Sequence, residues 1–250
     1  MGWLHVLVTA ASGIAAMRAA IDRGDIDEAA RAGAAAGPTV IEQALAAPDR
    51  SAKLAGIAAA PLAEDRAELL PALARLAAGP DRRVAIPAAD AARTIARDFA
   101  RHGRPDDIAD ADVIVWRDTW WTLARRRDRW IAVRILALDV ATTLDPTAID
   151  LPTALTDPDP AYRRAAIEAV PMPVPTALRA ALATAVVKDI DPDVALAAAH
   201  ILCADLASAP AQPIIDALGP AGVARIRTLV TAKAPAHLLR DAKRCLSGKP

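Results

Sequence analysis

Apolar and small side chains recur along this 250-residue chain at the spacing that lines one face of an α-helix. Two segments show the pattern most fully, and their apolar positions are Tyr162, Ala165, Ala166, Ala169 and Val170, and Val194, Ala197, Ala198, Ile201 and Leu202. An Asp stands three residues before each first position, with a Pro beside it. Because an Asp side chain accepts hydrogen bonds from the first free N–H groups of a helix, it marks the helix N-terminus. The pattern therefore predicts amphipathic helices with defined starts.

These helices recur along the chain at a regular interval, hereafter the repeat period. The four recurring Asp residues are Asp49, Asp81, Asp159 and Asp191, and the first apolar positions that follow them are Ala52, Val84, Tyr162 and Val194. The first two Asp residues are 32 positions apart, and so are the last two. Trp130, which lies 32 positions before Tyr162, supplies a fifth copy. An insertion around 101–128 then precedes the middle copy.

An earlier helix is expected in each unit, so that each unit is a helical hairpin. The expected first helices are Thr39–Ala46, Leu62–Ala78, Ala109–Arg125, Thr147–Leu155 and Pro175–Lys188. Pro71 and Pro87 should bend or split the helices that contain them. Alanine is the best helix former, whereas the aromatic residues that favour strands are only 3% of the chain. The predicted fold class is all-α, a right-handed α-solenoid of stacked hairpins.

The stretch TDPDPAYRRAAIEAV resembles the start of the second helix in a HEAT-like (armadillo-type) repeat, which typically reads D-P-x-V-R-x-x-A-A. The matching residues are Asp157, Pro158, Tyr162, Arg163, Arg164, Ala165 and Ala166. The resemblance extends over residues 38 to about 207 and is weak at both ends. It implies a solenoid of HEAT-like hairpins. HEAT-like arrays in general act as scaffolds and binding surfaces, and only a few subfamilies are enzymes.

The net charge and the absence of known catalytic motifs argue against several classes of function. Thirty Lys and Arg residues balance thirty Asp and Glu residues, which argues against a dedicated nucleic-acid binder. Phosphate-binding loops, the G-x-S-x-G nucleophile motif and the H-E-x-x-H metal motif are all absent from the sequence. We therefore expect no cofactor, no metal and no catalytic residues.

The N-terminal segment 1–24 is assigned separately from a single solenoid domain over 25–250. Residues 3–17 carry no Lys, Arg, Asp or Glu, as in the core of a signal peptide, but no Lys or Arg precedes them. An amphipathic first helix is the other interpretation. The chain is accordingly expected in the cytoplasm, or exported if residues 1–16 are a cleaved signal. No internal transmembrane span is expected.

The stretch 101–130, which contains the central insertion, holds four of the five tryptophans and a run of arginines. Helical spacing places Trp116 and Trp120 on one face, so both are expected in the core, and Trp121 is expected at its rim. Trp130 is also expected to be buried, because it stands at the first apolar position of its unit. The candidate binding residues are Trp121, Arg125, Arg126, Arg127 and Arg129.

Cys203 and Cys245 are the only cysteines. Cys203 lies three residues after His200 on a mostly apolar helix, where a core thiol is expected and a shared metal ion is the alternative. A Cys203–Cys245 disulfide is a further alternative. It requires close helix packing, because Cα atoms of stacked helices are usually about 8–10 Å apart and a disulfide needs about 7 Å or less.

The expected function is a non-enzymatic scaffold for protein–protein interaction, with another protein as partner and no role for nucleic acid. The alternative is an enzyme that acts on nucleic acid. HEAT-like DNA glycosylases use Trp, Asp and Arg on a concave surface, and the residue types of the insertion are similar. That alternative predicts that Trp121 and the arginines 125–129 line one groove beside an exposed, unpaired Asp.

Overall fold

The computed structural model describes residues 2–103, 108–206, 211–230, 240–241 and 245–246. Every regular element within these ranges is a helix, as the composition predicts, and none is a strand. The chain forms two compact units, Met1–Asp145 (unit 1) and Pro146–Pro250 (unit 2). The two units are described separately below.

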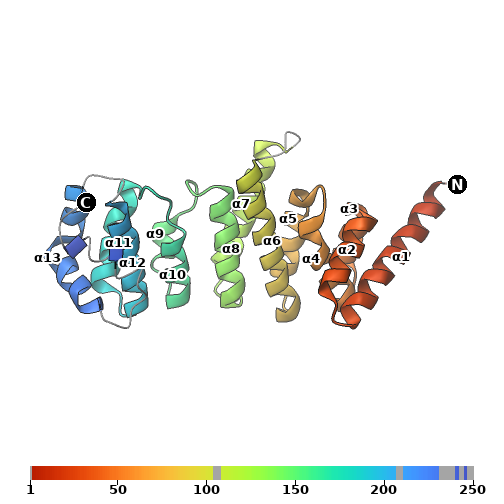
Figure 1. The fold of residues 1–250 in the computed structure, drawn as a ribbon, viewed down its shortest axis with the longest axis horizontal. Coiled ribbons are helices and arrows are strands. Elements are labelled where there is room, and N and C mark those ends of the chain that lie inside the picture. Colours follow the sequence, from red (N-terminus) through yellow and green to blue (C-terminus); the bar gives the residue numbers. More distant parts are fainter. Residues whose placement is uncertain (1, 104–107, 207–210, 231–239, 242–244, 247–250) are drawn as a thin grey trace. The chain divides into compact units, whose positions relative to one another are not determined.

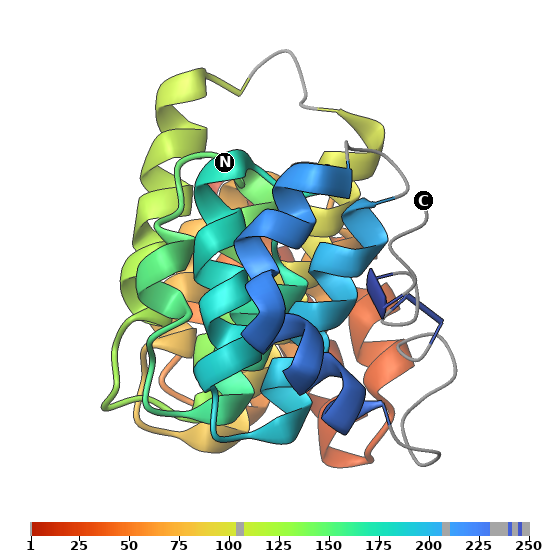
Figure 2. The same cartoon turned by 90° about the vertical axis from the view of Figure 1, so that its left-hand side faces the viewer.

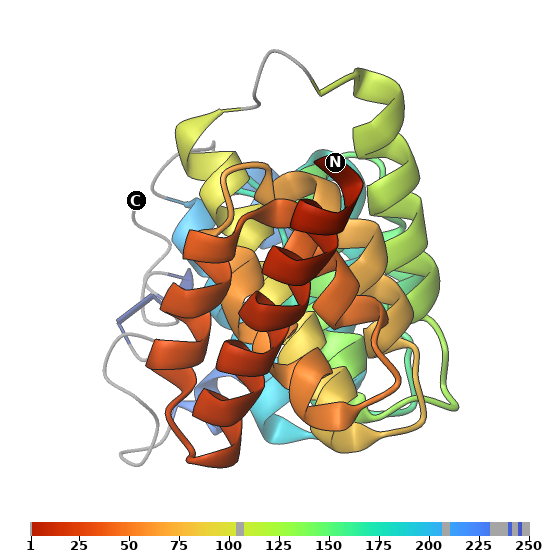
Figure 3. The same ribbon diagram turned by 90° about the vertical axis from the view of Figure 1, so that its right-hand side faces the viewer.

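Unit 1 contains two leading helices and three hairpins (Figure 1). Its helices are α1 (Gly2–Asp22), α2 (Ile26–Ala36), α3 (Pro38–Ala46), α4 (Arg50–Ala59), α5 (Leu70–Ala77), α6 (Arg82–His102), α7 (Asp110–Ala124) and α8 (Ile131–Leu144). The second helices of the hairpins, α4, α6 and α8, pack on one another in order, and the first helices α3, α5 and α7 do the same. Figure 3 shows α1 and α2 side by side, and both also contact α4. Unit 1 is thus two layers of stacked helices.

Unit 2 repeats this arrangement of helical hairpins (Figure 2). Its helices are α9 (Leu151–Ala154), α10 (Pro160–Glu168), α11 (Thr176–Lys188), α12 (Pro192–Asp205) and α13 (Ala211–Leu229). The hairpin α9–α10 precedes the hairpin α11–α12, and α13 covers α11 and α12. Gly219 interrupts α13 with a left-handed φ of 60°, a conformation that glycine adopts without strain.

The predicted helix starts are confirmed. Asp49, Asp81, Asp159 and Asp191 are the N-cap residues of α4, α6, α10 and α12, and each side chain accepts a hydrogen bond from a backbone N–H of the first turn. Arg18 and Arg50, which stand one repeat period apart, add a second contact to two of these carboxylates. Arg18 pairs with Asp49 at 3.0 Å and Arg50 pairs with Asp81 at 2.8 Å. A capping Asp therefore also joins its helix to the preceding repeat.

Small side chains let neighbouring helices approach closely. Alanine supplies much of the buried surface of both units. Gly33 of α2 shows how tight the contact is, because a Cβ atom added there would lie 2.4 Å from the Cβ of Ala59 and 2.7 Å from the Cε of Met17. No real Cβ tolerates such a distance, so the packing of α1, α2 and α4 requires glycine at this position.

Proline affects two helices differently. The expected helix Leu62–Ala78 is divided into 3₁₀ turns at Ala60–Leu62 and Arg66–Leu69 followed by α5, with Pro71 in the first turn of α5. A proline in that position has no N–H that the helix needs. In contrast, α6 continues through Pro87 and is not split there. The sequence also predicts a last helix over 235–246, which falls largely outside the described residues.

Arg163 and Asp189 connect the two hairpins of unit 2. The guanidinium of Arg163 donates from Nε to Oδ2 of Asp189 at 2.7 Å and from Nη2 to Oδ1 at 2.8 Å. The two side chains are only 12% and 6% exposed. Burial raises the pKa of Asp189, but the hydrogen bonds from Arg163 and from the backbone N–H of Asp191 and the positive charge of Arg163 lower it further, so the net pKa lies below its ordinary value.

Two substitutions of Asp81 should distinguish how much its helix cap and its ion pair with Arg50 each contribute to the unfolding free energy. Asp81→Ala removes both the cap of α6 and the pair with Arg50, and should cost about 1–2 kcal/mol of unfolding free energy. Asp81→Asn keeps an oxygen that caps the helix and loses only an exposed ion pair, and should cost about 0.5 kcal/mol or less. Urea unfolding monitored by circular dichroism measures both. Equal losses in the two variants would show that the cap contributes nothing.

Asp189→Asn should lower the unfolding free energy by about 3 kcal/mol at neutral pH, because it leaves the charge of Arg163 without its carboxylate. The folded-state pKa of Asp189 is depressed, so its stabilisation is present above the unfolded value of about 3.9 and is lost as pH falls through the folded value. The difference between wild type and variant should therefore be constant from neutral pH to about pH 5 and shrink below about pH 4.

Glu168→Gln on the helix of Arg163 is the matched control, because Glu168 forms an exposed pair with Arg164. It should change the unfolding free energy by about 0.5 kcal/mol or less. Urea titrations at several pH values measure both variants. A difference between wild type and Asp189→Asn that does not vary with pH would contradict the assignment of the stabilisation to the Asp189 carboxylate.

Candidate functional site

The turn between α7 and α8 carries the candidate binding residues from the sequence. Trp116 and Trp120 of α7 are buried, as predicted. Trp121 was expected at the rim, but only 8% of it is exposed. The guanidinium carbon of Arg125 lies 5.2 Å from the centre of its ring, in a cation–π contact. The expectation for Trp121 was wrong because α7 packs on both α5 and α8, which cover more than one face of the helix.

The arginines of this turn are not equivalent. Arg126 donates to both carboxylate oxygens of Asp128, and Arg129 pairs with the same group at 3.2 Å. The hydrogen bond from Arg126 is the main cause that holds the pKa of Asp128 below its ordinary value. Arg125 and Arg127 are exposed beside this cluster. The turn therefore presents a net positive surface whose carboxylate is already paired.

Trp130 is not buried as predicted, and 45% of it is exposed. It is the N-cap residue of α8, the position that Asp49 and Asp81 occupy in α4 and α6. The first apolar position of this repeat is accordingly Val133, which is fully buried, so the expected register of the middle copy was three residues too early. Arg126 and Arg129 hold Asp128 in the turn, and α8 begins after it.

Arg82 contacts Trp130 across the repeat boundary. Its guanidinium carbon lies 5.6 Å from the centre of the Trp130 ring. Arg82 follows the N-cap of α6 just as Arg50 follows the N-cap of α4, and Arg50 contacts the N-cap Asp81 of the next second helix. The same position in the repeat thus makes an ion pair in one case and a cation–π contact in the other.

A groove crosses the second-helix layer of unit 1. It encloses about 460 Å³ and has a mostly apolar wall. Its lining, hereafter the second-helix groove, comprises Ile21, Gly24, Ile26, Leu54, Ile57, Ala58, Pro61, Pro87, Asp90, Ala91 and Thr94. Ile26 at its edge is 61% exposed, an unusual position for a large apolar side chain. The groove can accept aliphatic side chains from another molecule.

The polar end of the second-helix groove lies on α6. Asp90 pairs with Arg93, and the hydroxyl of Thr94 donates to the backbone oxygen of Asp90 at 3.1 Å. Sequence reasoning did not identify these residues as functional. The repeat period is the signal that could have identified them. Each groove residue of α6 follows a groove residue in or just after α4 by about one repeat period. The counterparts of Pro87, Asp90, Ala91 and Thr94 are Leu54, Ile57, Ala58 and Pro61.

A second cavity of about 290 Å³ lies beside the C-terminal half of α6. Arg66 and His102 both contact the carboxylate of Asp98, which lines it. The hydrogen bond from Arg66 is the main cause that lowers the pKa of Asp98. Glu64, Asp65 and Glu68 add three further carboxylates to the lining. Arg66 and Asp98 are again separated by one repeat period.

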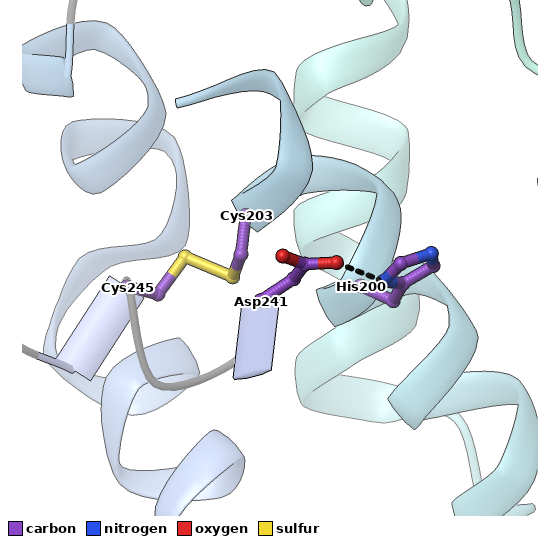
Figure 4. The surroundings of a disulfide bond; sticks show 4 residues. All are labelled: His200, Cys203, Asp241 and Cys245. Carbon is purple, nitrogen blue, oxygen red and sulfur yellow. Dashed lines mark ion pairs between the residues drawn. A yellow bond between two sulfur atoms is a disulfide. The ribbon is translucent and has the colours of Figure 1, made fainter. Parts of the chain in front are cut away.

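Cys203 and Cys245 are joined in a disulfide, and their Cα atoms are 5.4 Å apart (Figure 4). Cys203 lies on α12, so the bond attaches Cys245 to the last hairpin. His200 faces Asp241, with 3.1 Å between Nδ1 and Oδ2. While Cys203 is in the disulfide it has no free thiolate, so it cannot share a metal ion with His200.

Two further kinds of site are absent from the described residues. No group of three or more His, Cys, Asp or Glu side chains there is arranged to hold a metal ion. No helix there combines the length and apolar character that crossing a membrane requires.

Comparison with known proteins bears on the fold alone. No protein-family profile and no curated protein matches the sequence. Among solved structures, Kap121p matches 83% of this chain with a TM-score of 0.50 and 14% identity, and the chain spans 26% of its length. A designed armadillo repeat protein matches 84% of the chain with a TM-score of 0.53 and 14% identity, over 98% of its own length. These similarities, with the stacked hairpins, show that the chain has a HEAT/armadillo-like helical repeat fold.

Proposed function

We propose that the protein is a non-enzymatic scaffold whose second-helix groove binds an apolar segment of a partner protein. The observation that carries the proposal is the groove itself, an apolar depression built by the α1–α2 turn, α4 and α6. Exposed aliphatic surface such as that of Ile26 is costly in water and is typical of surfaces that contact another protein.

The shape of the groove supports a segment with aliphatic side chains as its occupant. Leu54, Ile57 and Ile21 supply the apolar wall, and Asp90 and Thr94 supply polar groups at one end only. Such a surface recognises apolar side chains by burial and orients them by a few hydrogen bonds. The solved structures that resemble the chain are repeat proteins, which agrees with a binding surface formed by successive repeats.

The tryptophan–arginine turn is a secondary contact in this proposal. Arg125, Arg126 and Arg127 are exposed and could meet acidic groups of the same partner. The turn does not favour the nucleic-acid enzyme, because Trp121 is buried and Asp128 is ion-paired. The catalytic alternative requires Trp121 to line a groove beside an exposed, unpaired Asp.

Site-specific photo-crosslinking tests the proposal. A photoreactive amino acid at Thr94 lies in the groove, and one at Thr119 of α7 is the matched control. Both threonines are exposed, and each hydroxyl donates to the backbone oxygen four residues earlier. We expect a partner protein to crosslink from position 94 and not from position 119, with identification by mass spectrometry.

The identified partner is then purified and its Kd measured by calorimetry. Thr94→Trp should weaken binding by about tenfold or more, because the indole fills the groove, whereas Thr119→Trp should leave the Kd unchanged. Equal crosslinking from the two positions, or a Kd that Thr94→Trp does not change, would rule out the groove as the binding surface.

A further inference from the structure

Another cavity of unit 1, of about 380 Å³, opens between two successive turns that lead into second helices. Its lining, hereafter the basic cavity, comprises Pro48, Arg50, Lys53, Arg75, Leu76, Gly79, Pro80, Asp81 and Val84. None of these residues belongs to the second-helix groove. Three cations and one carboxylate therefore surround a floor of aliphatic and proline side chains.

The charges of the basic cavity are not balanced from within. Asp81 caps α6 and pairs with Arg50, so both of those charges are used. Lys53 and Arg75 form no ion pair with any residue in the described part of the chain. The cavity consequently favours an occupant that brings a negative charge together with an apolar group.

The corresponding turn of unit 2 has the complementary chemistry. Residues 189–193, hereafter the acidic turn, read Asp-Ile-Asp-Pro-Asp and contain no cation. Ile190 at its tip is 92% exposed. Asp189 pairs with Arg163 and Asp191 caps α12, whereas the carboxylate of Asp193 is exposed and makes no ion pair within the described residues. The turn thus presents an isoleucine beside the carboxylate of Asp193, whose charge acts on Arg164 without forming an ion pair with it.

From this complementarity we infer that the protein associates with itself, with the acidic turn of one copy seated in the basic cavity of another. Ile190 lies against the aliphatic floor near Leu76 and Val84, and Asp193 meets Lys53 and Arg75. The contact is heterologous, because it joins two different surfaces, so one copy of a pair keeps a free basic cavity and the other keeps a free acidic turn. It removes the most exposed large apolar side chain of the described residues from water.

A second copy fits these observations better than a nucleic acid does. A polyphosphate backbone has no aliphatic group to cover the apolar side chains that line the cavity. The acidic turn supplies both groups that the cavity accepts. The inference is also separate from the proposed function, since it uses neither the second-helix groove nor its partner.

Sedimentation velocity of the full chain over a range of micromolar concentrations tests the inference. We expect association at low salt that weakens at high salt, where the screening length falls from about 8 Å at 0.15 M to about 3 Å at 1 M. Lys53→Glu combined with Arg75→Glu (the cavity variant) and Ile190→Lys combined with Asp193→Lys (the turn variant) should each weaken association by about tenfold or more.

Mixing the two variants gives the sharpest result. The cavity variant retains a wild-type acidic turn and the turn variant retains a wild-type basic cavity, so the mixture should associate although neither variant does alone. Val115→Lys is the control, because Val115 is 60% exposed on α7 and belongs to neither surface. Circular dichroism spectra that match wild type establish that all variants fold.

Three outcomes would overturn the inference: a wild-type chain that stays monomeric at low salt, variants that associate as wild type does, or a mixture that remains monomeric. Gel retardation of a DNA or RNA oligonucleotide by a monomeric wild-type chain, lost in the cavity variant, would assign the cavity to phosphates instead. None of these outcomes affects the crosslinking test of the second-helix groove.

Discussion

The stacking of the hairpins depends on the close packing of small side chains, and the capping Asp of each second helix fixes where that helix begins. Asp49 and Asp81 satisfy free N–H groups of their own helices and accept an arginine from the preceding repeat. A short-range requirement of the helix end is thereby coupled to the spacing between repeats. In unit 2 the contact between hairpins lies two residues before the capping residue. Arg163 of the preceding hairpin forms a buried pair with Asp189, and Asp191 caps α12.

The surface chemistry of the turns follows from this arrangement. Once the capping carboxylates are paired, the charges left over decide what each turn presents to solvent. In unit 1 these are the cations Lys53 and Arg75, whereas in unit 2 the carboxylate of Asp193 is left. The zero net charge of the chain therefore conceals two turn surfaces of opposite sign. The faces of the second helices carry little charge and form the apolar groove.

The central insertion shows where reasoning from sequence succeeds and where it stops. The helical spacing of Trp116 and Trp120 places both correctly in the core, because one apolar face of α7 is enough to predict it. Trp121 and Trp130 were assigned wrongly. The burial of Trp121 depends on the neighbours of α7, and the exposure of Trp130 depends on arginines that hold Asp128 in the turn. The second-helix groove was also missed, although the repeat period aligns the residues that form it.

The order of residues alone predicts most of the helices, the repeat period, the capping residues and hence the fold class. Each of these depends on contacts within one or two helical turns, which the order of residues encodes directly. Three-dimensional packing was needed to establish the register of the middle repeat, the contact of Arg82 with Trp130 and the joining of Cys203 to Cys245. It also placed Lys53 and Arg75 around one cavity. These features depend on residues far apart in the chain, and their distances are set by how closely the alanine-lined helices pack.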